Sequence, residues 1–374
     1  MDFSLSQEQQ LLRDSVRKFV EKQYTFSKRR ALMQTTDGFS REHWATFAEL
    51  GWTAIPFAEQ QGGLGGSAVD LCVVMEELGN GLVLEPYFPT VVFAGAVLAA
   101  ANQPHANSLL QRIIDGTLLA AVAWAERESR FDFTQVTTRV TAAGVGYVLN
   151  GEKQLVLSGD SADLLIVSAR VSGDNNASGG FTLFAVDAKA AGVQRTGYRT
   201  VDGLRAADIT FSNVMLDADA VVGTVGDGLA LLSPAIDRSL VALGAEAVGI
   251  MDTMQRQTVA YSKERKQFGV AIGSFQALQH NMVDMLMECE LSRSMLYMAA
   301  MKLDAHAPDS AKSAAALKAH IGKSGRLVGQ TAIQIHGGIG MTDELAISHY
   351  FKRLTAINIL FGGTDHQLNR YSTL

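Results

Sequence analysis

The stretch that decides the fold is ALLSPAIDRSLVALGAEAVGIMDTMQRQTVAYSK, residues 230–263. Its apolar residues recur at helical spacing, which predicts one long helix. Residues 275–306 and 310–336 repeat this apolar striping and are rich in Ala and Met. Because helices of this length bury their stripes only against one another, we expect residues 225–374 to form a four-helix bundle.

The first region, residues 1–117, also has helical periodicity. Ser6 and Gln9 have the spacing of a capping box, and Ser40 can cap a second helix that ends at Gly51. A glycine run follows at residues 62–66. Because no strand precedes this run and no Lys-Ser/Thr follows it, we interpret it as a plain loop rather than a phosphate-binding one.

Between these two helical regions, residues 118–224 have a different pattern. Short β-prone segments are separated by Gly, Asn and Asp, which predicts an antiparallel barrel or sandwich. Asn150-Gly151 is a strong signal for a tight turn between two of these segments. The order helices, β-domain, helices makes the fold class α+β. The expected strands are 118–124, 136–142, 147–149, 155–157, 164–169, 181–186 and 207–211.

The composition excludes several classes of function. The net charge of −6 argues against a nucleic-acid-binding surface. The N-terminus lacks a basic region followed by an apolar one, and residues 91–101, the longest apolar stretch, are too short to span a bilayer. We therefore expect a cytoplasmic protein with no stable membrane insertion.

The sulfur-containing side chains indicate packing rather than chemistry. Cys72 and Cys289 both lie in apolar helical patterns, so we expect buried free thiols. A methionine-rich stripe is likewise interpreted as packing and not as a metal site, and no metal is expected. The stripe comprises Met282, Met285, Met287, Met295 and Met298.

Three motifs carry a family resemblance. They are Glu264-Arg265-Lys266-Gln267-Phe268-Gly269 with Phe275-Gln276 behind it, Gln334-Ile335-His336-Gly337-Gly338-Ile339-Gly340, and His349-Tyr350-Phe351-Lys352-Arg353 followed by Phe361-Gly362-Gly363-Thr364. With them the chain resembles an acyl-CoA dehydrogenase over essentially its whole length. It is most similar to the small subunit of a heteromeric enzyme of the pimeloyl-CoA dehydrogenase type. Further support comes from Leu84-Glu85-Pro86-Tyr87 and Asp202-Gly203-Leu204-Arg205-Ala206.

The resemblance implies FAD as cofactor and an acyl-CoA as substrate, within fatty acid metabolism. In the family the arginine of the first motif reaches across a dimer interface to the neighbouring subunit's FAD pyrophosphate, a role that suits its planar fork. The glutamine and the glycine pair of the second motif lie around the FAD, and His336 would lie next to the cofactor. The expected cofactor-binding residues are Arg265, Gln267, Phe268, Gln276, Gln334, Gly337, Gly338 and Thr364.

The resemblance fails at the catalytic base. The family removes the α-proton of the thioester with a carboxylate, most often the glutamate of Tyr-Glu-Gly-Thr, and Gly362 stands at that position. Some members place the glutamate on the first bundle helix, where this chain has Ser239. Gly362 can still offer its N–H to the thioester carbonyl, but no carboxylate. The carboxylates that could substitute are Asp365, Glu246 and Asp237, of which Asp237 is expected to be an ion-pair partner and Glu246 to lie in the bundle.

The segments that face the flavin in the family also differ. Residues 125–132 have bulky or charged side chains where the family has Thr-Glu-Pro-Gly-x-Gly-Ser-Asp. Leu155-Val156-Leu157 replaces a Trp-Ile-Thr strand, which removes a hydrogen bond near the flavin. We expect these leucines to be ordinary barrel core.

Four hypotheses for the function follow. The first is a dehydrogenase subunit without its own base that works in a hetero-oligomer with a homologous large subunit. The second is a self-sufficient enzyme with a relocated carboxylate. The third is a scaffold that binds acyl-CoA or a partner without flavin, and the fourth is other chemistry on the same fold, such as flavin-dependent oxygenation. The partner is a homologous large subunit or a second copy of the chain, as a dimer or tetramer. The cofactor motifs are retained while the residues of the reacting centre are replaced, which favours the first hypothesis.

Overall fold

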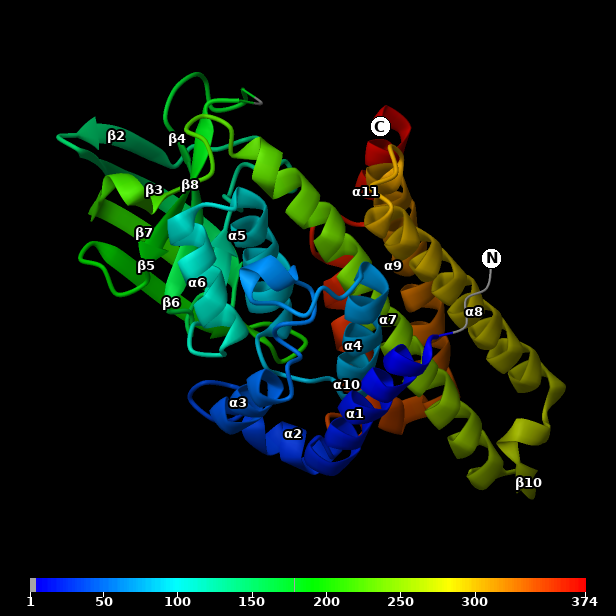
Figure 1. Cartoon of the computed structure of the whole chain (residues 1–374). Coiled ribbons are helices and arrows are strands. Elements are labelled where there is room, and N and C mark those ends of the chain that lie inside the picture. The colour runs from blue at the N-terminus through cyan, green and yellow to red at the C-terminus, as the bar shows by residue number, and fades with distance from the viewer. Residues whose placement is uncertain (1–4, 178) are drawn as a thin grey trace.

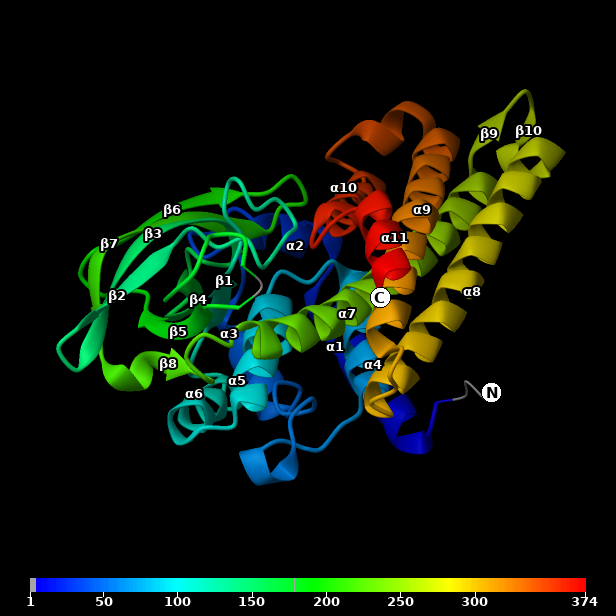
Figure 2. The same cartoon turned by 90° about the horizontal axis from the view of Figure 1, so that it is seen from above.

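The computed structural model describes residues 5–177 and 179–374 and arranges them as helices, a sheet and a helical bundle (Figure 1). Viewed from above, the sheet and the bundle lie at opposite sides of the molecule, with N-terminal helices between and beneath them (Figure 2). The order of the elements confirms the predicted α+β class.

Two helices of the N-terminal region, α1 and α3, begin at the caps that were predicted. Ser6 and Gln9 form the capping box of α1, and the Ser40 side chain accepts a hydrogen bond from the His43 backbone N–H at the start of α3. The glycine run at residues 62–66 is a loop, as expected. The elements are α1 (Gln7–Gln23), α2 (Phe26–Leu32), α3 (Arg41–Glu49), η1 (Glu59–Gln61), α4 (Ala68–Gly81), the π-helical η2 (Phe88–Ala94), α5 (Gly95–Ala101) and α6 (Pro104–Ile114).

The middle region forms one eight-stranded sheet with the strand order β6-β7-β3-β2-β4-β5-β8, and β1 pairs with β4. Most pairs are antiparallel, as predicted, but β1 and β4 are parallel. The sequence analysis missed β6, whose residues alternate between exposed and half-buried. The strands are β1 (Ala120–Ala123), β2 (Arg139–Ala143), β3 (Gly146–Leu157), β4 (Leu164–Arg170), β5 (Phe181–Asp187), β6 (Val193–Arg199), β7 (Arg205–Leu216) and β8 (Val221–Val222), with η3 (Ala218–Ala220) before β8.

The tight turn predicted at Asn150-Gly151 is wrong, because both residues lie inside the single strand β3. The turn is instead at Gly144-Val145, since Ala143 pairs with Gly146 across the β2–β3 hairpin. At Asn150-Gly151 the register of β3 with β7 shifts, between Leu149 and Gly151. A Cβ on Gly151 would lie 2.7 Å from the Thr138 Cα, so the glycine permits close approach of two backbones.

Both faces of the sheet are buried in its centre. All seven residues of β4 are buried, and Ile166 packs with the helices while Leu165 and Val167 belong to a second core on the opposite face. This explains the continuous apolar run in that strand. The expectation of barrel core is wrong for Leu155, which is 41% exposed at a φ of 50°.

The C-terminal bundle consists of α7 (Leu229–Glu264), α8 (Gln276–Asp304), α9 (Ser310–His336), α10 (Ala346–Ile359) and the short α11 (Thr364–Thr373). Helix α9 has the predicted bounds. Helix α7 is long and apolar enough to cross a membrane, but 67% of its apolar window is buried as core. The connections contain the hairpin β9 (Lys266–Gln267) and β10 (Val270–Ala271), η4 (Ile272–Ser274) and η5 (Gly337–Met341).

The sulfur-containing residues are mostly core. Cys72 and Cys289 are buried free thiols, as predicted. Met282 and Met285 are buried, but Met287 is 56% exposed, so the packing interpretation is wrong for it. It lies on the face of α8 that turns away from the bundle. Among the residues that the structure describes, no three His, Cys, Asp or Glu side chains gather as metal ligands would.

Candidate functional site

The position of the family's base lies in the loop between α10 and α11. Gly362 is buried at a φ of 96°, and its N–H donates to the Ile359 carbonyl oxygen, so that N–H is already engaged within the loop. Lys318 of α9 donates from Nζ to the carbonyl oxygens of Asn358 and Gly362, 3.0 Å away in each case. Lys318 is completely buried, and this burial lowers the pKa of its amine to about 7.

The alternative base position is equally unsuited to proton abstraction. Ser239 is buried in α7, and its hydroxyl donates back to the Ala235 carbonyl oxygen at 2.8 Å. A serine that bonds its own helix backbone, four residues earlier, is a common structural arrangement. Among the described residues, no carboxylate forms a hydrogen bond with this hydroxyl.

The three substitute carboxylates all have other roles. Asp237 pairs with Arg370 at 2.5 Å, which confirms the predicted ion pair; burial raises the pKa of Asp237 although Arg370 opposes the rise. The two carboxylate oxygens of Glu246 accept hydrogen bonds from Nε and Nη2 of Arg353, at 2.6 and 2.7 Å. Asp365 is exposed in the first turn of α11. None of the three is free and buried beside Gly362.

The surroundings of Gly362 are aromatic. Phe361 stacks on Trp124 with ring centroids 5.8 Å apart and planes 11° apart, and it also meets Phe88 and Phe93 edge-on. His366 packs against Phe131 at 5.4 Å. The sequence analysis named neither His366 nor Trp124. The signal that could have identified His366 is its position, four residues after Gly362 and at the start of a helix.

A second cluster lies at the other end of the bundle, around the β9–β10 hairpin. Every residue from 263 to 270 is exposed, and Phe268 is 92% exposed. The guanidinium of Arg265 has no hydrogen bond or ion pair within residues 5–177 and 179–374. Gln276 follows the hairpin at the start of α8 and is also exposed.

The glycine-rich turn after α9 lies at this same end. Tyr261, near the end of α7, stacks on His336 at 4.3 Å, which ties the two cofactor motifs together. Gln334, Gly337 and Gly338 are exposed, and a Cβ added to either glycine would meet nothing within 4 Å.

These residues fit the pyrophosphate end of a dinucleotide. The Gly337 N–H is engaged by the carbonyl oxygens of Ile333 and Gln334. An unpaired guanidinium and exposed amide side chains are the donors that phosphate oxygens accept from. Thr364 does not belong to this group, because its hydroxyl contacts the Ala319 carbonyl oxygen near Gly362.

The two clusters are far apart. Lys318 marks the base position and Gln334 the cofactor end, and both lie on α9. Because they are 16 positions apart, a rise of 1.5 Å per residue places them ~24 Å apart along the helix. The position of the catalytic base, which is packed with side chains, thus lies far from the exposed residues that could bind the cofactor.

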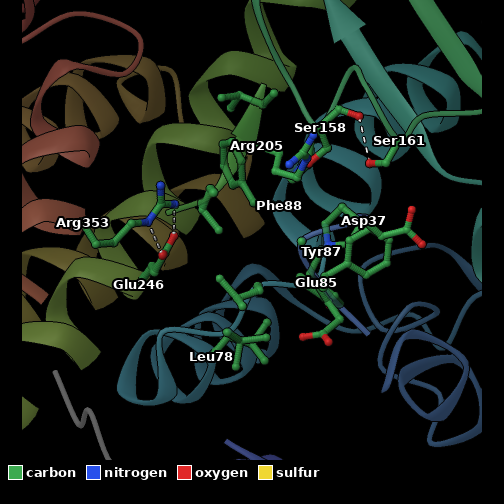
Figure 3. Close-up of a pocket in the computed structure, with 18 of the residues that line it drawn as sticks. Asp37, Leu78, Glu85, Tyr87, Phe88, Ser158, Ser161, Arg205, Glu246 and Arg353 are labelled. Carbon is green, nitrogen blue, oxygen red and sulfur yellow. Dashed lines mark hydrogen bonds and ion pairs between the residues drawn. The ribbon is translucent and has the colours of Figure 1, made fainter. Parts of the chain in front are cut away.

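A third feature is a cavity where the three regions meet (Figure 3). Its volume is ≈ 60 Å³, and its lining mixes aromatic side chains such as Phe88 and Tyr87 with charged groups. Arg205 and Glu246 face it from opposite sides (Figure 3), and each is paired, to Asp160 and Arg353 respectively.

Comparison with known proteins identifies the family. The models of the acyl-CoA dehydrogenase N-terminal, middle and C-terminal domains match residues 6–117, 121–216 and 226–372. The acyl-CoA dehydrogenase IpdE2 of Mycolicibacterium smegmatis is 30% identical over 367 residues, which cover 98% of each chain.

Two solved structures extend the likeness. The Tcur3481–Tcur3483 steroid ACAD variant is 29% identical with a TM-score of 0.89, over 99% of this chain and 98% of that one. The ChsE4–ChsE5 complex from Mycobacterium tuberculosis is 26% identical with a TM-score of 0.90, over 100% of this chain and 98% of that one. The chain thus belongs to the acyl-CoA dehydrogenase family of FAD-dependent oxidoreductases that act on CH–CH groups.

Proposed function

We propose that this chain is the subunit of a hetero-oligomeric acyl-CoA dehydrogenase that lacks its own catalytic base and completes the FAD site of a homologous partner. The supporting observation is the separation just described. The residues suited to hold a cofactor are exposed at one end of α9, where the Arg265 guanidinium has no partner among the residues that the structure describes, while the base position ~24 Å away is occupied by the chain's own side chains.

Arg265 is the main group offered to the partner. Its planar fork can bind two phosphate oxygens, and it stays charged at any physiological pH. Gln334 would add a neutral donor at the same place, beside the open turn at Gly337 and Gly338. When bound, FAD supplies the two-electron acceptor for the substrate's CH–CH bond.

The partner would cover an apolar stripe on α8. Val283, Leu286, Met287 and Leu291 are each between 46% and 56% exposed and share one face of the helix. Phe268 extends this apolar surface on the hairpin that carries Arg265. A contiguous apolar face of this kind is typical of a protein interface. A homologous subunit would present the same helix, and a second copy of this chain is the alternative occupant.

The geometry disfavours a relocated base. Asp237 and Glu246 already neutralise Arg370 and Arg353, and abstraction of a proton would require breaking those pairs. Asp365 is open to water and lacks the buried setting beside a substrate in which catalytic carboxylates are usually found. The self-sufficient enzyme is thus the second hypothesis, and it is tested by the same measurement.

The substrate class follows from the family, whose substrate is an acyl-CoA. Two of the similar structures are a steroid ACAD variant and a two-protein complex, which agrees with an unusual acyl-CoA and a hetero-oligomer. A cytoplasmic location remains a prediction of the sequence.

The test is the visible spectrum of the purified chain before and after anaerobic addition of a panel of acyl-CoAs, alone and with its homologous partner. We expect no bleaching of flavin by the chain alone and bleaching in the complex. Bleaching by the chain alone would refute the proposal in favour of a relocated base. A complex without flavin would favour the scaffold. Arg265→Met should weaken flavin retention by the complex, whereas Lys263→Met, also exposed and two residues away, serves as the matched control.

A further inference from the structure

The space that a side chain on residue 362 would need is already occupied by His366. A Cβ built on it would stand 2.7 Å from the Cγ of His366 and 3.1 Å from its Cβ, with the ring Cδ2 closer still. Real Cβ atoms do not approach other carbons so closely. The two ring atoms are therefore the obstruction, because they lie within 3.0 Å, whereas the contact with the His366 Cβ is tight but of a kind that real side chains make.

The backbone at this position excludes a side chain independently. At a φ of 96°, Gly362 is in a region that L-residues with a Cβ rarely adopt. The N–H to Ile359 and the carbonyl to Lys318 hold it there from both sides. The loop has therefore formed around the glycine, so restoring a carboxylate requires more than one substitution.

Aromatic contacts join this loop to the middle region at two points. Phe361 stacks on Trp124, and His366 packs on Phe131, seven positions further along the same segment of the middle region. These four rings, which we call the aromatic seal, connect the base position with residues that face the flavin in the family. Ile236, Phe133, Gln367 and Arg370 complete the lining.

The seal leaves a cavity of ≈ 10 Å³, about the room for one water molecule. A thioester carbonyl with its α- and β-carbons needs the volume of several heavy atoms. The Gln367 Oε1 and Arg370 Nη1 atoms are buried beside this cavity with no hydrogen-bond partner among the described residues, and one water molecule would suit both the size and the polarity of the cavity.

We propose that His366 takes the place of the missing base side chain and that the aromatic seal closes this chain's own acyl-thioester site. The inference rests on the proposed function and deepens it: acyl-CoA is then bound only at the partner's site. It predicts that Gly362→Glu alone does not restore dehydrogenation.

A thermodynamic cycle on the full chain tests the position of His366 without reference to activity. Gly362→Ala should raise the unfolding equilibrium constant through both strain and overlap. The control is Gly226→Ala, whose φ is 83° and whose Cβ would meet nothing within 4 Å, so that it reports backbone strain alone. We expect Gly362→Ala to exceed the control by about 5- to 150-fold, the range for overpacking a core.

In a His366→Ala background the cost of Gly362→Ala should fall to that of Gly226→Ala. Equal costs of Gly362→Ala in both backgrounds would overturn the assignment of His366. This result is independent of the proposed function, because urea unfolding needs neither partner nor substrate. If the wild-type chain alone bleached its flavin, the proposed function would fail, and the cycle would still decide where His366 lies.

Ligand binding tests the closure itself. Titration calorimetry with butyryl-CoA should show no saturable binding to the wild-type chain alone and saturable binding to the His366→Ala/Phe131→Ala variant. Equal binding by both proteins, or binding by neither, would overturn the aromatic seal as the barrier. A matched control is His320→Ala, a half-buried histidine of α9 outside the seal, which should behave as wild type.

Discussion

Replacing Arg353 by Met should be among the most destabilising single changes in the chain. Arg353 is 5% exposed and lies where the three regions meet. It donates to both Glu246 oxygens and, at 2.8 Å, to Asp202 beside the β6–β7 turn. Burial alone would lower the pKa of Arg353, but the two carboxylates raise it above its ordinary value, so it is always charged.

The magnitude follows from what the substitution leaves behind. Glu246 is 8% and Asp202 2% exposed, and methionine leaves both carboxylates buried without their cation. Breaking a buried ion pair by removing one partner costs about 3–5 kcal/mol. Arg29 compensates only in part, because its charge acts on Asp202 while its Nη2 donates to the Asp202 backbone carbonyl and not to the carboxylate.

Urea unfolding at neutral pH, followed by circular dichroism, measures this loss. Arg41→Met is the control, since Arg41 and Asp37 form a pair with side chains 58% and 38% exposed, worth only about 0–1 kcal/mol. In a Glu246→Gln background the cost of Arg353→Met should fall, because one of the stranded charges is gone. A cost below about 1 kcal/mol, or one that Glu246→Gln does not change, would refute the account of the buried network.

Three further outcomes are expected. The pKa of Lys318 is about 7 in the folded chain and near its ordinary value in the unfolded chain, so the unfolded state binds more protons between these values. Stability should therefore rise with pH above about 7, by up to about 1.4 kcal/mol per pH unit relative to Lys318→Met. The exposed Lys323→Met serves as control, and a pH-independent difference would contradict the burial argument. Arg265→Met should release flavin from the partner complex with no change in the urea midpoint, and a lowered midpoint would indicate a structural role instead. Asp237→Asn should lower stability and leave substrate bleaching of the complex unchanged; loss of bleaching would identify it as a base.

The helices were predictable because their patterns are long and local. The bounds of α9 were predicted to the residue, since 27 residues of striped sequence average out individual exceptions. The Asn150-Gly151 prediction failed because the same glycine signal serves a tight turn and a close backbone approach. Gly144-Val145 is the weaker turn signal locally, and only the pairing of β2 with β3 selects it.

The candidate site was also predictable only in part. The motif around Gly362 showed that the position of the catalytic base holds no carboxylate, but the sequence could not show whether the substitute carboxylates are free or paired. Whether Glu246 is free or paired depends on Arg353, 107 positions later in the chain. His366 and Trp124 come together only when α11 docks on the middle region. Such contacts between distant segments leave no periodic trace in one sequence.

The separation along α9 explains how a chain can keep one half of the family's chemistry without the other. The Arg265 hairpin and the Gly337 turn are tied to each other by the Tyr261–His336 stack, and no part of that contact involves the loop at Gly362. The loop is held instead by Lys318 and by the Trp124 stack. Distant sites without shared partners respond to substitution independently. Changes that fill the base position therefore leave the cofactor end intact, which is what a subunit that serves its partner requires.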